Sequence, residues 1–202
     1  MAFPESSDVA GGDTGLISQY NNLRADVIDN HDNLPGIPVI RAYTSGATWT
    51  KPANLKYIVV EVQAAGGNGG AHSHANWSDN SNGGGGGAGG YSKKIIAVAS
   101  LGATETIIVG AVGSNSSFGS IITCNKGNNA SGSTRGIGGT ATGGDINVTG
   151  GDGSSVRDYG NTQPTIGGSS FFGGSKAYGS GGLGGSGGGY PAIVIVTEYS
   201  TQ

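Results

Sequence analysis

The sequence is poor in large apolar residues and in charges. Leu, Ile, Val and Phe together supply 39 of the 202 residues, and Asp, Glu, Lys and Arg supply 11%. A chain of this composition cannot bury a broad core along its whole length. Its formal net charge of −3 is also too small for a typical disordered chain. We therefore expect part of its order to come from backbone hydrogen bonds and from partner chains.

Further absences exclude several classes of function. Ten Lys and Arg against thirteen Asp and Glu create no basic field, which argues against nucleic-acid binding. No run approaches eighteen apolar residues, so we expect no membrane insertion. A single cysteine, Cys124, excludes an intramolecular disulfide and a cysteine-based zinc site. Residues 1–8 have no cationic or apolar segment, so we expect no secretory signal. If the protein acts outside a cell, we expect it to be released by lysis of that cell.

Glycine is abundant and unevenly distributed. Of its 43 residues, five lie in residues 1–65, 38 in residues 66–189 and none in residues 190–202. This distribution predicts an N-terminal helical arm over residues 1–38, for oligomerisation or attachment, and a glycine-rich β domain over residues 39–202.

The arm is expected to form a helix from Thr14 to Asn30. Its apolar residues recur at spacings of four, three and four, which places them on one stripe of the helix. These residues are Leu16, Tyr20, Leu23 and Val27. Two heptads are too few for a stable isolated helix. The stripe therefore predicts either a helix lying on its own β domain or a helix that oligomerises or docks on another protein.

Short runs rich in β-branched residues follow the arm. They are Val39–Tyr43, Ile58–Ala64, Ser92–Ala99, Thr106–Val112, Phe118–Thr123 and Ala192–Tyr199. The last run is apolar on both faces, which is typical of a central strand. No helical pattern separates the runs, so the sequence predicts an all-β fold, an antiparallel β-sandwich with glycine-rich insertions.

The glycine tracts allow two interpretations. Within Gly179–Gly189, every third position is occupied by Ser180, Leu183, Ser186 and Gly189, with Gly-Gly between them. Three residues is the period of a polyproline II helix. Such a repeat would turn one substituted stripe outward and let bare glycine faces approach neighbouring chains closely. The alternative is a Gly/Ser linker without fixed structure. Strong strands on both sides of the tracts favour packed layers.

Several ordered segments resemble the glycine-rich domain of bacteriophage tail fibres. The opening, Tyr43–Ala53, is followed by the strand Tyr57–Val62 and a first glycine tract. Gly83–Gly90 precedes Tyr-Ser-Lys-Lys, and the end of the domain is Gly187–Val196. The likeness covers about residues 39–200 and leaves the arm outside it.

This resemblance implies a virion fibre or adhesin domain, often trimeric, at the part that touches the host. We therefore expect a non-enzymatic tail-fibre subunit that binds the bacterial surface, either a glycan or an outer-membrane protein. Its other expected partners are copies of itself, in a homotrimer, and other virion tail proteins. A more distant likeness is to phage adhesins that stack polyglycine II helices and bind receptors through the connecting loops.

Aromatic residues among small residues are the best candidates for receptor contact, because rings stack on sugars and anchor interfaces. We expect contacts from Trp77, Tyr159 and Tyr178, with Asp79 and Arg157 supplying neighbouring hydrogen bonds. For the adjacent pair Phe171 and Phe172, a small local core under the glycine layers is favoured instead.

His72 and His74 share a face of an extended chain, because side chains alternate along it. Imidazoles are good ligands for transition metals, and pairs from three chains could surround one ion on a symmetry axis, as His-x-His does in trimeric phage fibres. Otherwise the pair is solvated or contacts a glycan. We expect no other cofactor.

No motif in the sequence indicates catalysis. Gly184–Gly188 fits the G-x-S-x-G pattern, but no helix can follow it, as a nucleophile elbow requires. The chain is therefore predicted not to be an enzyme. The principal alternative is a self-assembling virion fibre or spacer without a receptor of its own. A polysaccharide-cleaving enzyme and an ice-binding protein are further alternatives.

Overall fold

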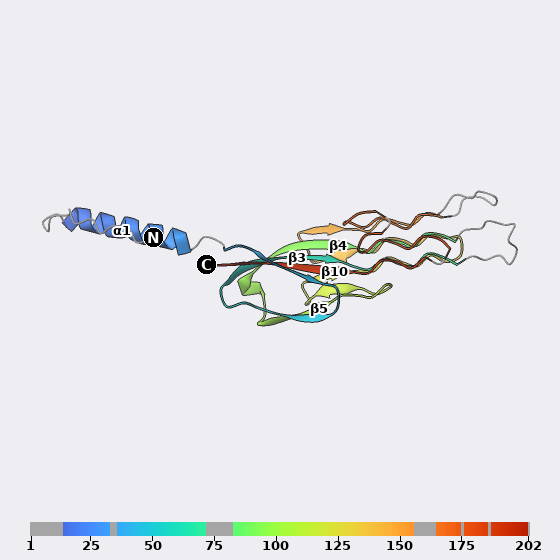
Figure 1. The fold of residues 1–202 in the computed structure, drawn as a ribbon, viewed down its shortest axis with the longest axis horizontal. Helices are drawn as coiled ribbons and strands as arrows, with labels where there is room; N and C mark the ends of the chain where they lie inside the picture. The colour runs from blue at the N-terminus through green and yellow to red at the C-terminus, as the bar shows by residue number, and fades with distance from the viewer. Residues whose placement is uncertain are drawn as a thin grey trace.

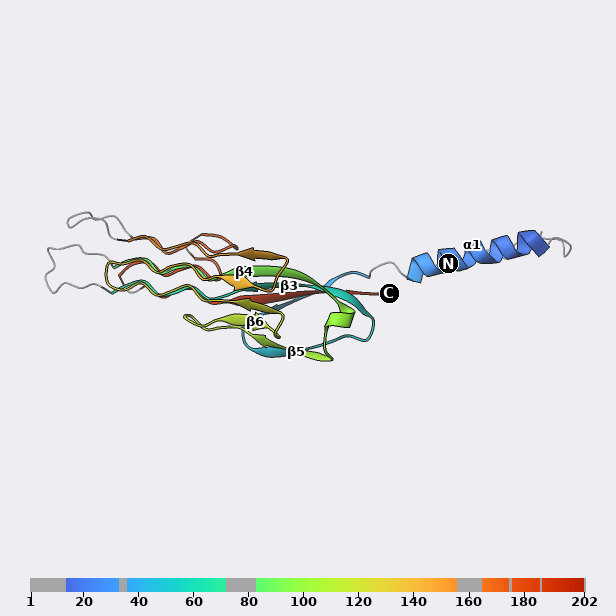
Figure 2. The same ribbon diagram turned by 180° about the vertical axis from the view of Figure 1, so that it is seen from behind.

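The computed structural model describes residues 14–32, 36–71, 83–155, 165–174, 176–185 and 187–201. Helix α1 (Thr14–Asp32) lies at one end of an elongated molecule, strands occupy the middle, and glycine-rich segments occupy the other end (Figures 1 and 2). The predicted all-β architecture with a short N-terminal helix is confirmed.

Two five-stranded antiparallel sheets form the sandwich. The first has the order β1 (Val39–Tyr43), β10 (Ile193–Ser200), β3 (Leu55–Gln63), β4 (Tyr91–Ala97) and β9 (Ile146–Val148). The second has the order β2 (Ala47–Thr50), β5 (Thr104–Ile108), β6 (Ser116–Phe118), β7 (Ile122–Cys124) and β8 (Ala141–Thr142). A 3-10 turn, η1 (Val98–Ser100), follows β4.

The core lies between the sheets and is supplied chiefly by β3 and β10. Ile58, Val60 and Val62 on β3 are fully buried, as are Val194 and Val196 on β10. They alternate with residues on the outer face, as expected for strands with one face toward a core. Strand β10 lies between β1 and β3, so its predicted central place is confirmed.

A polar contact joins the two sheets inside this core. The indole Nε1 of Trp49, on β2, donates to Oε1 of Glu198, on β10, at 2.7 Å. Arg41 Nε donates to the same oxygen at 2.8 Å, and this hydrogen bond raises the pKa of its guanidinium group. Glu198 is only 3% exposed, so these two donors replace water around a buried carboxylate.

Three details of the predicted strands are wrong. Phe118–Thr123 is not one strand, because the chain turns after Phe118 at Gly119, whose φ is +53°, and resumes as β7. The strand expected over Thr106–Val112 ends at Ile108. The short strands β2, β8 and β9 were not predicted from the sequence.

Helix α1 does not lie on the β domain. Its described side chains, those of residues 18–28, are all exposed, and Tyr20, Leu23 and Val27 are 45%, 63% and 49% exposed. The alternative of a helix packed on its own domain is therefore wrong. Among the described residues, no helix combines the length and apolarity needed to cross a membrane.

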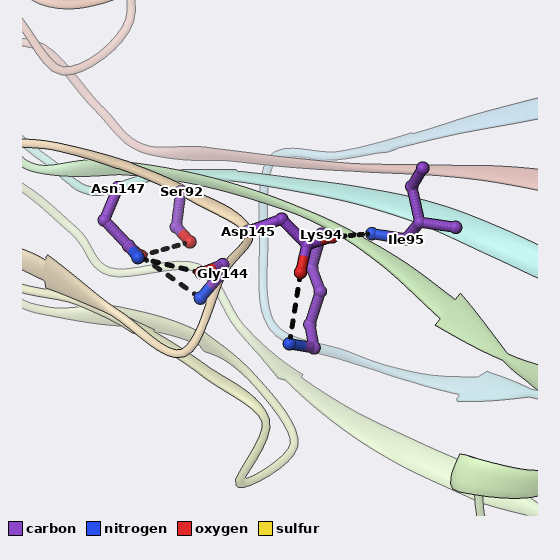
Figure 3. Close-up of polar contacts among 6 residues, drawn as sticks. All are labelled: Ser92, Lys94, Ile95, Gly144, Asp145 and Asn147. Carbon is purple, nitrogen blue, oxygen red and sulfur yellow. Dashed lines mark hydrogen bonds and ion pairs between the residues drawn. The ribbon is translucent and has the colours of Figure 1, made fainter.

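The part of β4 that extends beyond its short pairing with β9 is capped by the turn between β8 and β9 (Figure 3). Asp145 Oδ2 accepts from the backbone N–H of Ile95 at 2.9 Å, and Asp145 also pairs with Lys94 at 3.6 Å. The amide side chain of Asn147 exchanges hydrogen bonds with the backbone of Gly144. The carboxylate occupies a donor that a foreign strand could otherwise use, which protects the edge from strand addition.

The thiol of Cys124 is enclosed in the core and should be inert. Burial raises its pKa from 9.0 to about 12, and Sγ donates to the carbonyl of Val62 at 3.3 Å. At pH 8 we expect a thiol reagent to label the native protein only after unfolding. Since the folded pKa exceeds the unfolded one, the thiol's contribution to stability is complete below about pH 9 and is lost as pH rises toward 12. Labelling of the native protein at the rate of a free thiol would contradict this.

Candidate functional site

Extended glycine-rich segments leave the sandwich side by side and form what we call the glycine lattice. Its segments are residues 64–70, 83–90, 125–130, 135–140, 149–154, 165–169, 179–184 and 187–192. Figure 1 shows these thin segments running on from the strands, away from α1. Most of the hydrogen bonds that join these segments run between backbone groups, and side chains such as Asn68, Asp152 and Thr165 add others.

Residues 83–90 form the central segment of the lattice. Its N–H groups donate to three neighbouring segments in turn, over 2.7–2.9 Å. Gly84, Gly87 and Gly90 donate to residues 125–132, Gly85 and Ala88 donate to residues 151–154, and Gly86 and Gly89 donate to residues 179–182. A neighbour that recurs every third residue requires three residues per turn, the period of a polyproline II helix.

The carbonyl groups of the central segment face a second set of neighbours with the same period. Residues 84, 87 and 90 accept from the segment 64–70, residues 85 and 88 accept from 136–139, and Gly86 accepts from Gly168. Gly89 accepts instead from Nε2 of Gln63, at 2.8 Å. Every N–H and C=O group of residues 84–90 is therefore paired, although almost no side chain is present.

Glycine is required in this segment by lack of space. A Cβ added at Gly85 or Gly87 would lie under 3.0 Å from the backbone of Ile166 or Ile137, respectively. None of the glycines in residues 83–90 has a positive φ, so conformational freedom is not the reason. The lattice thus uses glycine to bring backbones together, where Cα–H groups also approach carbonyl oxygens.

The lattice is built from out-and-back pairs of segments. Residues 64–70 run antiparallel to residues 83–90, since Gly67 donates to Gly87 and Gly70 to Gly84. At the end far from the sheets, Gly84 donates to Gly132 and Gly185 donates to Gly70. We call the region of these residues the far end. Two of the chain reversals that the structure describes lie there.

Two chain reversals at the far end are described. One is a tight turn in which Ser131 and Thr134 pair across Gly132, whose φ is +54°. In the other, the N–H of Gly187 donates to the carbonyl of Leu183. The single outward stripe expected over Gly179–Gly189 is therefore wrong. The chain turns within this range, and Ser180 is fully buried on the outgoing segment.

Most of the residues predicted to bind a receptor lie outside the described residues. These are Trp77, Asp79, Arg157 and Tyr159, and the predicted metal ligands His72 and His74 also lie outside them. The side chain of Leu16 is likewise outside the described part. In the sequence, Trp77 follows Ala71 and Tyr159 follows Ser155. Ala71 and Ser155 each come directly after a lattice segment that reaches the far end.

Tyr178 is described, and it lies at the opposite end of the lattice. The next residue, Gly179, donates to the carbonyl of Pro191 and accepts from Gly89, close to where β4 and β10 begin. Tyr178 is therefore not part of the far end. It is 39% exposed and lines a pocket of about 420 Å³ beside β10, together with Tyr190 and Lys176. This pocket could not be predicted from the sequence, because its walls come from separate parts of the chain.

The small local core expected from Phe171 and Phe172 is wrong, because both side chains stay partly exposed and pack against Tyr91 on β4. The ring of Phe171 stacks on Tyr91 with centroids 3.7 Å apart, and Phe172 meets both rings edge-on. The two phenylalanines remain 54% and 39% exposed. Burial, followed by the hydrogen bond from its hydroxyl to Glu61, raises the pKa of Tyr91. These three aromatic rings lie at the junction between the lattice and the first sheet.

Among the described residues, no group of three or more His, Cys, Asp or Glu side chains could hold a metal ion. The chain matches no protein-family model, and no curated protein matches it significantly.

Proposed function

We propose that the chain is a bacteriophage tail-fibre or adhesin subunit that binds the bacterial host surface without catalysing a reaction. The supporting observation is the glycine lattice, which stands out from the sandwich on the side away from α1 (Figure 1). A scaffold held by its backbone can carry connecting segments of varied sequence, which suits receptor binding. The resemblance of residues 39–200 to phage tail-fibre domains supports the same function.

In this proposal, the receptor is a bacterial glycan or an outer-membrane protein, and Trp77, Asp79, Arg157 and Tyr159 contact it. Helix α1 would join copies of the chain, in a homotrimer, or attach it to other virion tail proteins. The exposed stripe of Tyr20, Leu23 and Val27 supports this role, because such side chains are normally covered in an assembled fibre. Many weak contacts would then add up through multivalency.

Adsorption of fluorescently labelled protein to candidate host cells tests the proposal. We expect saturable binding by the native chain and at least a roughly tenfold loss in the Trp77→Ala/Tyr159→Ala double variant, the size of effect that two anchor residues carry. Ile95→Ala is the matched control, since Ile95 is 62% exposed on the sandwich. Equal binding by the double variant would contradict the choice of residues, and absence of binding to any host would contradict the function.

A structural spacer is the second candidate, and the exposed edge strand β1 favours it. Val39 and Ile40 on this strand are 48% and 68% exposed, and an apolar edge can pair with another chain. Sedimentation of the purified protein separates the two candidates. A spacer would polymerise without limit in the absence of cells, whereas a fibre subunit would stop at a discrete oligomer.

A further inference from the structure

The pocket beside β10 combines aromatic rings with one positive charge. It is lined by Phe172, Lys176, Ala177, Tyr178, Tyr190, Pro191, Ile193 and Ile195, with a volume of about 420 Å³. Pockets that take small molecules usually range from about 300 to 1,000 Å³ and have apolar walls with a few polar groups. The volume lies within this range, and the lining combines apolar walls with one lysine and two tyrosines.

The walls of the pocket are fixed to each other by backbone hydrogen bonds. Gly179 donates to the carbonyl of Pro191 at 2.8 Å, and Tyr190 donates to that of Ser180 at 2.9 Å. The backbone N–H of Lys176 donates to Gly174 at 2.7 Å. The segments that carry Tyr178, Tyr190 and Lys176 are thus held in place before any ligand arrives, which lowers the entropic cost of binding.

The polar groups of the pocket favour an anionic ligand. Lys176 is the only charged residue in the lining, and no carboxylate in the described part of the chain pairs with its ammonium group. The hydroxyl groups of Tyr178 and Tyr190 add hydrogen-bonding capacity at the ends of apolar rings. A ligand that matches this lining has an apolar face for the rings, hydroxyl groups and one negative charge.

We propose that the pocket binds a sugar residue bearing a carboxylate, of the uronic acid type, from a bacterial surface polysaccharide. This inference rests on the proposed function and names the chemistry of one of its receptors. The C–H face of a pyranose ring packs on the aromatic rings, and the carboxylate pairs with Lys176. Because the pocket lies near the sheets, this contact is separate from any contact made at the far end of the lattice.

Binding of methyl β-glucuronide and methyl β-glucoside to the purified full chain tests the proposal, because these sugars differ only at C6. Ligand-observed NMR titration should show saturable binding of both, with the glucuronide preferred roughly fivefold, about the strength of a partly exposed ion pair. Lys176→Gln should reduce the affinity for glucuronide to that for glucoside. Tyr178→Ala should lower the affinity for both sugars by a similar factor, because it removes the stacking contact and leaves the charge of Lys176 in place.

Lys126→Gln is the matched control, with the same loss of charge outside the pocket lining, and it should keep the preference. The proposal is overturned if neither sugar saturates, if Lys176→Gln keeps the preference, or if a second copy occupies the pocket, seen as pocket signals that shift with protein concentration. Cell adsorption measured in parallel separates the two proposals. Cell binding without sugar binding leaves the proposed function and removes this inference, whereas sugar binding without cell binding contradicts the proposed function and leaves only the affinity of the pocket for a carboxylate-bearing sugar.

Discussion

Gly87→Ala should disrupt the glycine lattice, at a cost of about 4 kcal/mol or more in stability. The added Cβ would lie under 3.0 Å from backbone atoms of Ile137 and Gly138, which cannot rotate away as a side chain can. Relief would require separation of the two segments and would weaken the hydrogen bonds that join Gly87 to Gly67 and to Asn128. Overpacking costs about 1–3 kcal/mol and each lost hydrogen bond about 1 kcal/mol, with further loss for buried groups left unpaired.

Amide hydrogen exchange and denaturant unfolding measure this effect. In the variant, the N–H groups of residues 84–90 should lose protection, while those of β3 and β10 in the sandwich should retain more of it. Gly188→Ala is the matched control, because the nearest atom to its added Cβ is Asn68 Oδ1 at 4.0 Å and its φ is not positive. We expect that variant to be neutral or up to about 1 kcal/mol more stable. Equal unfolding free energies for the two variants would refute close packing of the backbone.

Trp49→Ala should destabilise the sandwich by about 3–5 kcal/mol, the usual cost of removing a large buried aromatic side chain. The indole ring is 1% exposed, and its centroid lies 6.0 Å from that of Phe118. The substitution also removes a hydrogen-bond donor from the buried carboxylate of Glu198, which would keep only Arg41 among its two side-chain donors. The cavity and the lost donor act in the same direction.

Trp49→Phe separates these two contributions. It keeps most of the ring and removes the Nε1–H donor, so we expect a smaller loss of about 1–3 kcal/mol. Urea unfolding followed by circular dichroism gives both values without depending on tryptophan fluorescence. If Trp49→Ala lies within 1 kcal/mol of the native protein, the indole does not hold the two sheets together.

The sandwich could be predicted from the sequence where a strand carries its own pattern. Val39–Tyr43 was placed with the correct bounds, and the two-faced apolar run Ala192–Tyr199 identified the interior strand. Strand β2 was not predicted, because its four residues gain order from pairing with β5, which lies far along the chain. Gly119 looked like a strand glycine, but its positive φ makes it a turn.

The sequence predicts that glycine-rich segments pack closely together, but it does not predict which segments are neighbours. Period-three glycine spacing indicates close backbone approach, but every Gly-Gly pair offers the same donors and acceptors. Which segment neighbours residues 83–90 is decided by where the chain reverses, for example at Gly132 and Gly185. The pocket beside β10 is a product of the same folding, since Lys176 and Tyr190 meet only when two segments pair.

The direction of the strands has a mechanical consequence. Strands β3, β4 and β10 and the lattice segments follow the long axis of the molecule, and Gly36, just after the arm, is hydrogen-bonded to Ser200 at the end of β10 (Figure 1). A pull between α1 and the far end therefore acts along the strands, in shear. The bonds between β1 and β10 would have to break together rather than one after another, as in unzipping. If the proposed function holds, this geometry would suit a fibre that stays attached to a host cell while it is under tension.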